Sequence, residues 1–265
     1  MSGVLPLAGP DFPASPESFA DSLRAGLAAR DISARDIRAA GEWPRLAELA
    51  VDLSGAKFSR ATRVPRAETE PQPGVSIARL AVVAAPLHFE TVPLRLELRA
   101  QDAECAFARD AAREPVLQLT RTGGGSVAVE AQRADLEATL KTFAAAALAK
   151  QGAEVKSVRL ELNGLGPCSL GFRAEVTAKA FLMTARVIVT GRLDVDEQLT
   201  LRVRELATSG DGMIANLAGA FLRPRFLEME KRAISLAAFS FAGVKLHGVR
   251  LGGGDALRIE AQFGG

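Results

Sequence analysis

The stretch PLRLELRA, from Pro93 to Ala100, sets the pattern that decides the fold. Three leucines alternate without a break with three charged residues: Leu94, Arg95, Leu96, Glu97, Leu98 and Arg99. Because side chains of a β-strand point alternately to opposite faces, this pattern predicts a strand with one packed face and one solvated face. One-sided burial of this kind is typical of an antiparallel sheet.

The same alternation recurs from Val158 to Leu162 and from Leu199 to Arg204, and roughly eight to eleven strands are expected in all. The turn Thr122–Gly125, TGGG, lies between two such runs and predicts a hairpin, and the run near Gly252–Gly254 predicts another. Parallel βαβ units would need a helix after nearly every strand, which the chain does not supply. The predicted class is therefore α+β, with a highly curved antiparallel sheet and long helices on its concave face.

Three segments have helical periodicity. Ser15 is expected to cap a helix whose first residue is Pro16. A second helix is expected within Gln132–Gly152, with one apolar stripe formed by Leu136, Leu140, Phe143 and Ala147. A third is expected within Gly212–Arg232, where Pro224 should bend it.

The third helix has apolar residues on two faces, and each face must be covered. One face can pack on the sheet. The other needs a second helix, a partner chain, a membrane or an apolar ligand. The small residues at Ala144–Ala147 and Asn216–Ala220 would leave room for a ligand between helix and sheet.

No motif of a familiar catalytic or metal site is present. The two histidines, His88 and His247, lack neighbours at zinc-ligand spacing, and no G-x-S-x-G nucleophile motif occurs. The acids of LDVDEQL, residues 193–199, lack the spacing of a calcium loop, so a solvated turn is expected. Cys105 and Cys168 are expected to be free thiols, with a disulfide as the alternative.

Composition narrows the function further. The chain has one Trp, no Tyr and a net charge of +2 without a basic block, which argues against binding to nucleic acid or sugars. No apolar run is long enough to span a bilayer, and the N-terminus does not resemble a signal peptide. A cytoplasmic location is expected for the chain as it stands, or a periplasmic one if a leader is missing.

The C-terminal half resembles the TULIP (tubular lipid-binding) superfamily, in particular small bacterial single-module phospholipid-binding proteins. The resemblance is carried by the strand pair 172–195, the strand 199–210, a helix with an interior proline, and the final strands 234–251 and 256–263. It implies a highly curved sheet wrapped around two long helices, with an elongated apolar cavity for acyl chains. It also implies lipid binding or transfer without catalysis.

We therefore expect a lead-in over residues 1–14 and a single lipid-binding domain over residues 15–265. The expected partners are a lipid ligand and, transiently, a membrane, with no cofactor, metal or nucleic acid. Helix phase gives the candidate lining as Leu136, Leu140, Phe143, Ala147, Met213, Leu217, Phe221 and Leu227, with Arg223 and Arg225 as candidate headgroup contacts. Two alternatives stay open: a scaffold whose apolar helices bury against a partner or second copy, and an enzyme with two convergent polar side chains in the cavity.

Overall fold

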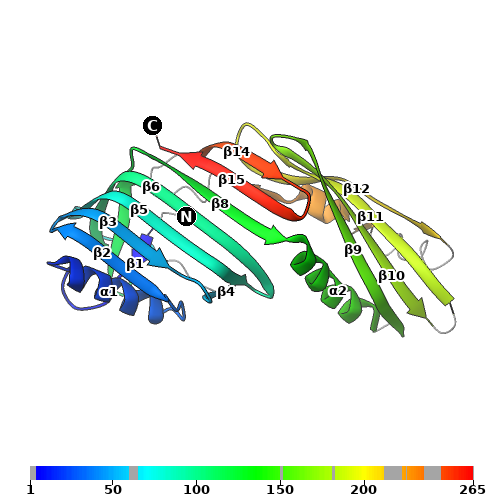
Figure 1. Cartoon of the computed structure of the whole chain (residues 1–265), viewed down its shortest axis with the longest axis horizontal. Coiled ribbons are helices and arrows are strands. Elements are labelled where there is room, and N and C mark those ends of the chain that lie inside the picture. Colours follow the sequence, from blue (N-terminus) through cyan, green and yellow to red (C-terminus); the bar gives the residue numbers. More distant parts are fainter. Residues whose placement is uncertain are drawn as a thin grey trace. The chain divides into compact units, whose positions relative to one another are not determined.

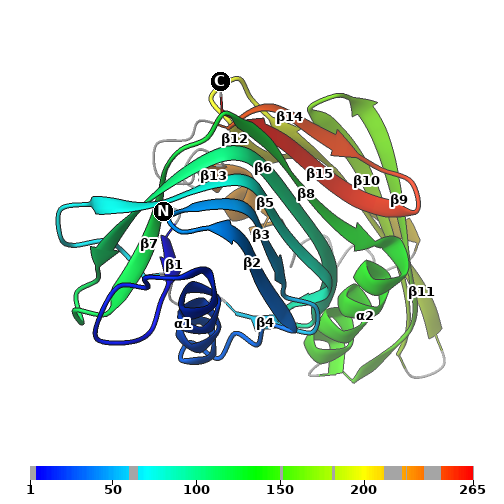
Figure 2. The ribbon, with the colours of Figure 1, turned by 60° about the vertical axis from the view of Figure 1, so that its left-hand side comes forward.

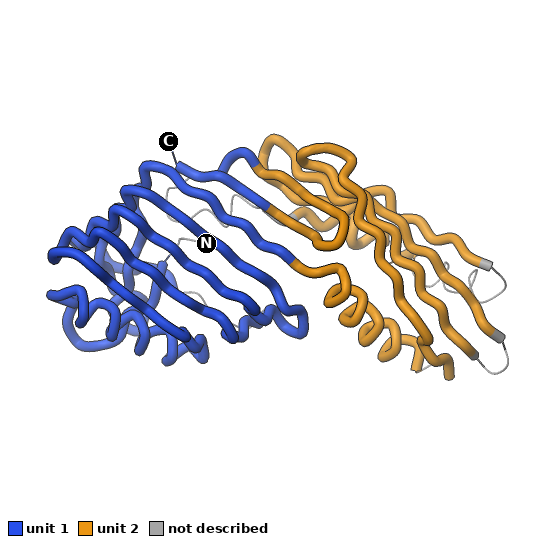
Figure 3. Tube along the Cα trace, in the orientation of Figure 1, with its two compact units in different colours: residues 1–130, 236–248, 260–265 blue, residues 131–235, 249–259 orange. Residues whose placement is uncertain are grey.

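A computed structural model describes residues 4–59, 65–149, 152–180, 183–211, 223–224, 226–235 and 246–264. The described residues are mostly strands, with two helices of seven or more residues, α1 (Pro16–Ala28) and α2 (Arg133–Ala149) (Figure 1). The chain divides into two compact units. Unit 1 holds residues 1–130, 236–248 and 260–265, and unit 2 holds residues 131–235 and 249–259 (Figure 3).

The strands form a ten-stranded and a five-stranded sheet. The larger contains β1 (Val4–Pro6), β2 (Asp36–Glu42), β3 (Arg45–Asp52), β4 (Lys57–Phe58), β5 (Gln72–Phe89), β6 (Val92–Arg109), β7 (Pro115–Arg121), β8 (Gly124–Gln132), β14 (Leu246–Gly252) and β15 (Ala256–Phe263). The smaller, in the order β13-β12-β11-β10-β9, contains β9 (Ala153–Gly166), β10 (Ser169–Ala180), β11 (Met183–Val195), β12 (Thr200–Asp211) and β13 (Ala233–Ser235).

This architecture corrects the predicted fold class. The prediction of an α+β fold, with one antiparallel sheet wrapped around two long helices, is wrong, because the described chain is mostly β and has two sheets. Two pairings of the larger sheet, β3 with β5 and β4 with β5, are also parallel. Alternation along a strand reports which face is packed, but it carries no information on the partner or its direction. Most of the predicted third helix lies outside the described residues, of which 223–224 and 226–231 are helical.

The predicted first helix is confirmed. Ser15 caps α1 through a capping box in which its hydroxyl accepts the backbone N–H of Ser18, and Pro16 occupies the first turn. Phe19 and Leu23 are fully buried, and α1 lies against β2 in unit 1 (Figure 2). They join a core with strand residues such as Leu49. Unit 1 therefore has an ordinary closed core beneath α1.

The strand β6 changes partner along its length. Its first half pairs with β8, where Arg95 lies opposite Glu130, and its second half pairs with β7, where Glu104 lies opposite Arg121. The TGGG turn therefore joins two strands that both pair with β6 and not with each other, so the predicted hairpin is wrong. The second Gly-rich turn does join neighbouring strands, β14 and β15.

In unit 2, β9 is the outermost strand of its sheet, and other elements occupy its free edge. The carboxylate of Glu137 in α2 accepts the backbone N–H of Leu160 at 2.7 Å. The backbone N–H of Gly254, in the β14–β15 turn, donates to the carbonyl of Leu162 at 2.8 Å. A Cβ on Gly253 would lie 2.7 Å from the same carbonyl oxygen, so the turn fits this edge only without a side chain there.

Candidate apolar ligand surface

One face of the unit 2 sheet is apolar among the described residues, apart from Thr208 of β12, which lies opposite Val189. Strand register puts its members side by side across β9 to β11. We call it the apolar face, and it consists of Val158, Leu160, Leu162, Phe172, Ala174, Val176, Val187, Val189, Gly191, Leu193, Val203 and Leu206. Neither these side chains nor that of Thr208 can carry a charge, so a ligand here would be recognised mainly by apolar contact.

A close approach at Gly191 shapes the middle of the apolar face. A Cβ at this position would lie 2.6 Å from the ring of Phe172 and 2.8 Å from a methyl carbon of Leu206. Glycine therefore lets the ring and the leucine meet over the strand. The result is continuous packing from β10 to β12.

The apolar face is only partly covered. Its β9 edge is buried, but Phe172, Val176, Val187 and Val189 keep part of their surface in contact with solvent. In unit 1, by contrast, Leu49 and its neighbours beneath α1 are fully buried. Sheet residues of this kind normally lie in a closed core. The half-open state of β10 and β11 therefore marks this face as a candidate binding surface.

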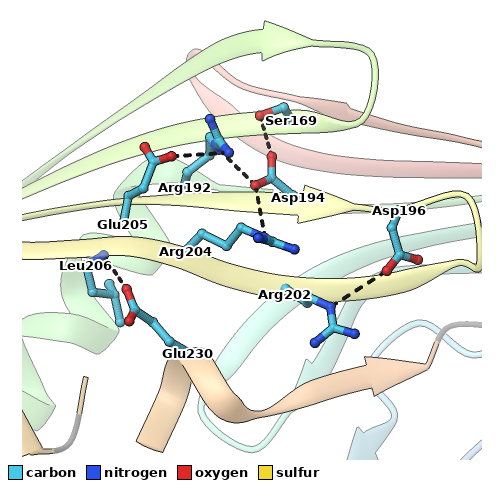
Figure 4. Close-up of polar contacts among 9 residues, drawn as sticks. All are labelled: Ser169, Arg192, Asp194, Asp196, Arg202, Arg204, Glu205, Leu206 and Glu230. Atoms are coloured by element: carbon cyan, nitrogen blue, oxygen red, sulfur yellow. Dashed lines mark hydrogen bonds and ion pairs between the residues drawn. The ribbon is translucent and has the colours of Figure 1, made fainter. Parts of the chain in front are cut away.

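The opposite face of the same sheet carries acidic and basic side chains that form ion pairs with one another (Figure 4). The carboxylate of Asp194 accepts the Ser169 hydroxyl at 2.7 Å and Arg192 Nε at 2.8 Å, and it lies 3.8 Å from Arg204 Nε. Arg192 also pairs with Glu205 at 3.2 Å. The hydrogen bond to Asp194 raises the pKa of Arg192 above its usual value. Basic and acidic groups thus pair within the sheet.

At the β11–β12 turn, an acidic side chain accepts hydrogen bonds from the backbone of the turn itself. The carboxylate of Asp196 accepts the backbone N–H groups of Thr200 at 2.8 Å and Gln198 at 3.1 Å, which lowers its pKa. Asp196 therefore orders this turn. No group of three or more metal-ligating side chains is found in the part of the chain that the structure describes.

The helix α2 carries the predicted stripe, but its side chains are not packed in a core. No residue of this 17-residue helix is buried, and Phe143 and Leu140 expose 64% and 38% of their surface. Leu136 is half-buried and Ala147 is exposed. An apolar stripe left open in this way needs a further partner to bury it.

Helix phase shows to which side of the sheet the stripe turns. Glu137 points at the edge of β9, and Lys141 lies near Glu154, which is opposite Lys179 on the charged face. Successive helical residues are about 100° apart, so Phe143 lies on the other side of Glu137 from Lys141. The stripe therefore lies on the side of α2 that turns away from the charged face.

Unit 1 has a comparable half-open region beyond its closed core. Across β5, β6 and β8, Val82 lies opposite Leu98 and Leu98 opposite Val127. The next rung joins Leu96 with Val129. Apart from buried Leu98, these side chains are half-buried. Each unit thus presents aliphatic sheet surface that its own described residues leave partly open.

The remaining predicted site residues do not form a single group. Leu227 exposes 53% of its surface and Arg223 is exposed, whereas Met213, Leu217, Phe221 and Arg225 lie outside the described residues. The sheet residues of the apolar face were not predicted as lining. The alternation in 172–206 predicts these strands, but it does not indicate which face a ligand would contact.

Other features of the described residues do not add to this surface. Cys105 is buried and Cys168 exposed, both are free thiols, and burial raises the pKa of Cys105 to about 12. A hollow of about 380 Å³ in unit 1 is rimmed by charged side chains, including Arg121 and Glu104, which pair at 2.7 Å. No helix among the described residues is long and apolar enough to cross a bilayer.

Searches of protein-family models, curated proteins and solved structures return no match to this chain.

Proposed function

We propose that this chain binds a lipid through its acyl chains, against the apolar face of unit 2. The observation that carries the proposal is the half-open surface of β10 and β11, where Phe172, Val176, Val187 and Val189 stay partly in water with no ionisable side chain beside them on that face. We also propose that the protein contacts a membrane transiently to load or deliver the lipid. As part of the same proposal, the chain is a member of the TULIP superfamily. The strand pattern of residues 172–210 supports that membership.

The dimensions and the side chains both favour an acyl chain. β10 has 12 residues, or about 40 Å at ~3.3 Å per residue, against ~15 Å for the hydrocarbon of one bilayer leaflet. Protein interfaces are enriched in Tyr, Trp, Phe, Met and Arg, and of these the apolar face as defined above has one, Phe172. A smooth aliphatic face with one aromatic ring suits a flexible hydrocarbon better than a folded partner.

The energetics require a second wall. Full burial of about ten methylene groups gives about 8 kcal/mol, which corresponds to a micromolar dissociation constant. Burial of one side only gives about half of this, which corresponds to millimolar binding. The open stripe of α2, with Leu140 and Phe143, is the described surface best suited to cover the second side.

The test compares two adjacent positions of β11 that face opposite ways. Val189 lies on the apolar face and Ile188 on the charged face, opposite Glu175. We expect Val189→Arg to reduce binding of a fluorescent long-chain fatty acid, and lipid recovered by organic extraction, at least about tenfold. Ile188→Arg should leave both unchanged, because its new charge lies beside Glu175.

Equal binding by the two variants would contradict a ligand on the apolar face. A wild-type protein that yields no lipid and forms an oligomer by light scattering would instead favour the scaffold alternative. Circular dichroism of both variants checks that each is folded, so that a loss of binding reports the face and not unfolding.

A further inference from the structure

We infer that the lipid bound on the apolar face has an uncharged headgroup, such as a hydroxyl, an ester or an amide, and that the Thr208 hydroxyl forms a hydrogen bond with it. The inference rests on the proposed function and deepens it, because it assigns the chemical class of the headgroup. Thr208 has the one polar side chain on the apolar face among the described residues.

Strand register places Thr208 beside the half-open part of the face. Thr208 lies opposite Val189 on β11, and Val189 lies opposite Ala174 on β10. All three are half-buried, as are Val176 and Val187 in the neighbouring rung. A ligand that covers β10 and β11 therefore comes within reach of the Thr208 hydroxyl.

The hydroxyl of Thr208 is available to a ligand. The hydroxyls of Thr120, Thr122 and Thr142 each donate to a backbone carbonyl, whereas the Thr208 hydroxyl has no hydrogen-bond partner in the described part of the chain. A hydrocarbon placed over it would remove its water and give no hydrogen bond in return, which is unfavourable. A ligand oxygen at this point restores the lost hydrogen bond.

The edge of β12 beside Thr208 has room for a headgroup. β13 pairs with β12 at Thr200–Arg202, and no other described strand continues alongside Thr208. Two residues further on, Gly210 lies opposite Val187 and has no side chain to cover this corner. A headgroup can therefore leave the face here while its first oxygen stays beside Thr208.

The charges at this edge favour an uncharged headgroup over an anion. The carboxylate of Glu230 accepts the backbone N–H of Leu206, two residues before Thr208, and the apolar face as defined above has no basic side chain. An ionised headgroup on this face would lose water without gaining a counter-ion, which costs far more than it does for a hydroxyl or an ester. A fatty acid therefore keeps its carboxylate in water and buries fewer of its methylene groups.

Replacement of the hydroxyl by a methyl group tests the contact. We expect Thr208→Val to weaken binding of hexadecanol about fivefold and to leave binding of hexadecane unchanged or tighter. Displacement of an uncharged fluorescent hydrocarbon probe measures both. Thr208→Ser keeps the hydroxyl and should retain hexadecanol binding. Thr190→Val is the matched control, because Thr190 lies on the charged face opposite Arg173, and it should match the wild type.

The same assay tests the charge of the headgroup. At a pH where the carboxylate is ionised, the wild type should bind hexadecanol at least about tenfold more tightly than hexadecanoate. Hexadecanoate binding as tight as that of hexadecanol would overturn the preference for an uncharged headgroup.

Equal hexadecanol binding by the wild type and Thr208→Val would overturn the hydrogen bond to Thr208. A similar loss in Thr190→Val would also overturn it, because the loss would then not depend on the face. These results leave the proposed function intact, since that function fails only if the folded wild-type protein binds none of the three ligands. Circular dichroism checks that each variant is folded.

Discussion

The carboxylate of Glu230 accepts the backbone N–H of Leu206 at 2.8 Å (Figure 4). This amide is available because β12 bulges there: Glu205 has a φ of +56°, and the register with β11 shifts between Thr190 and Arg192. The bulge leaves one donor outside the ladder, and a carboxylate from the helical residues 226–231 accepts it. Glu137 and Glu230 thus perform the same task, since each fixes a helical segment to a sheet amide that has no strand partner.

Removal of the Glu230 carboxylate should destabilise the protein. We expect Glu230→Ala to lower the free energy of unfolding by about 1–3 kcal/mol, because a partly buried donor is left unpaired. Glu228→Ala, two residues away and exposed, should change it by less than about 0.5 kcal/mol. Urea denaturation of the two variants provides the comparison. Equal urea midpoints for the two variants would mean that water takes the place of the Glu230 carboxylate without loss of stability.

The exposed ring of Phe143 should matter more for binding than for folding. Because 64% of its surface is already in water, Phe143→Ser should cost less than about 1 kcal/mol of stability. If the stripe of α2 is the second wall of the ligand site, the same change should weaken fatty-acid binding about fivefold to tenfold. Fluorescence titration alongside thermal unfolding separates the two effects. Lys141→Ser serves as a control, and an equal loss in both variants would argue against the stripe.

The buried thiol of Cys105 should make stability fall at alkaline pH. Burial raises its pKa from 9.0 to about 12, so above pH 9 the unfolded chain loses a proton that the folded chain keeps. The stabilising contribution is therefore complete below pH 9 and is lost as the pH rises toward 12, at about 1 kcal/mol per pH unit. Denaturation in buffers on either side of pH 9 should show a steeper decline for wild type than for Cys105→Ala. Parallel declines in the two proteins would mean that this thiol does not titrate differently on folding.

Sequence patterns located elements well where the information is local. The capping box at Ser15 and the first-turn proline were sufficient to place α1, and alternation at Leu94–Leu98 was sufficient to place β6. The second helix, expected within Gln132–Gly152, was also located, as α2. Each of these features depends on residues within a few positions of one another.

Features that depend on distant residues were not predictable in this way. Nothing near Val127 or Leu119 indicates that both β8 and β7 pair with β6, and nothing in β3 indicates that it pairs in parallel with β5. Partner choice is fixed by long-range packing, which a periodic pattern does not encode. The apolar face was missed for the same reason, because it exists only once β9 to β12 are in register.

The occupied edge of β9 has a consequence for how this protein behaves at high concentration. A sheet with a broad, partly wet aliphatic face and an open edge would invite other chains to add strands, which is the usual route to fibrils. Here Glu137 takes the N–H of Leu160, and Gly254 takes the carbonyl of Leu162. Both groups are therefore satisfied within the chain, so at this part of the edge neither is available to pair with a strand of another molecule.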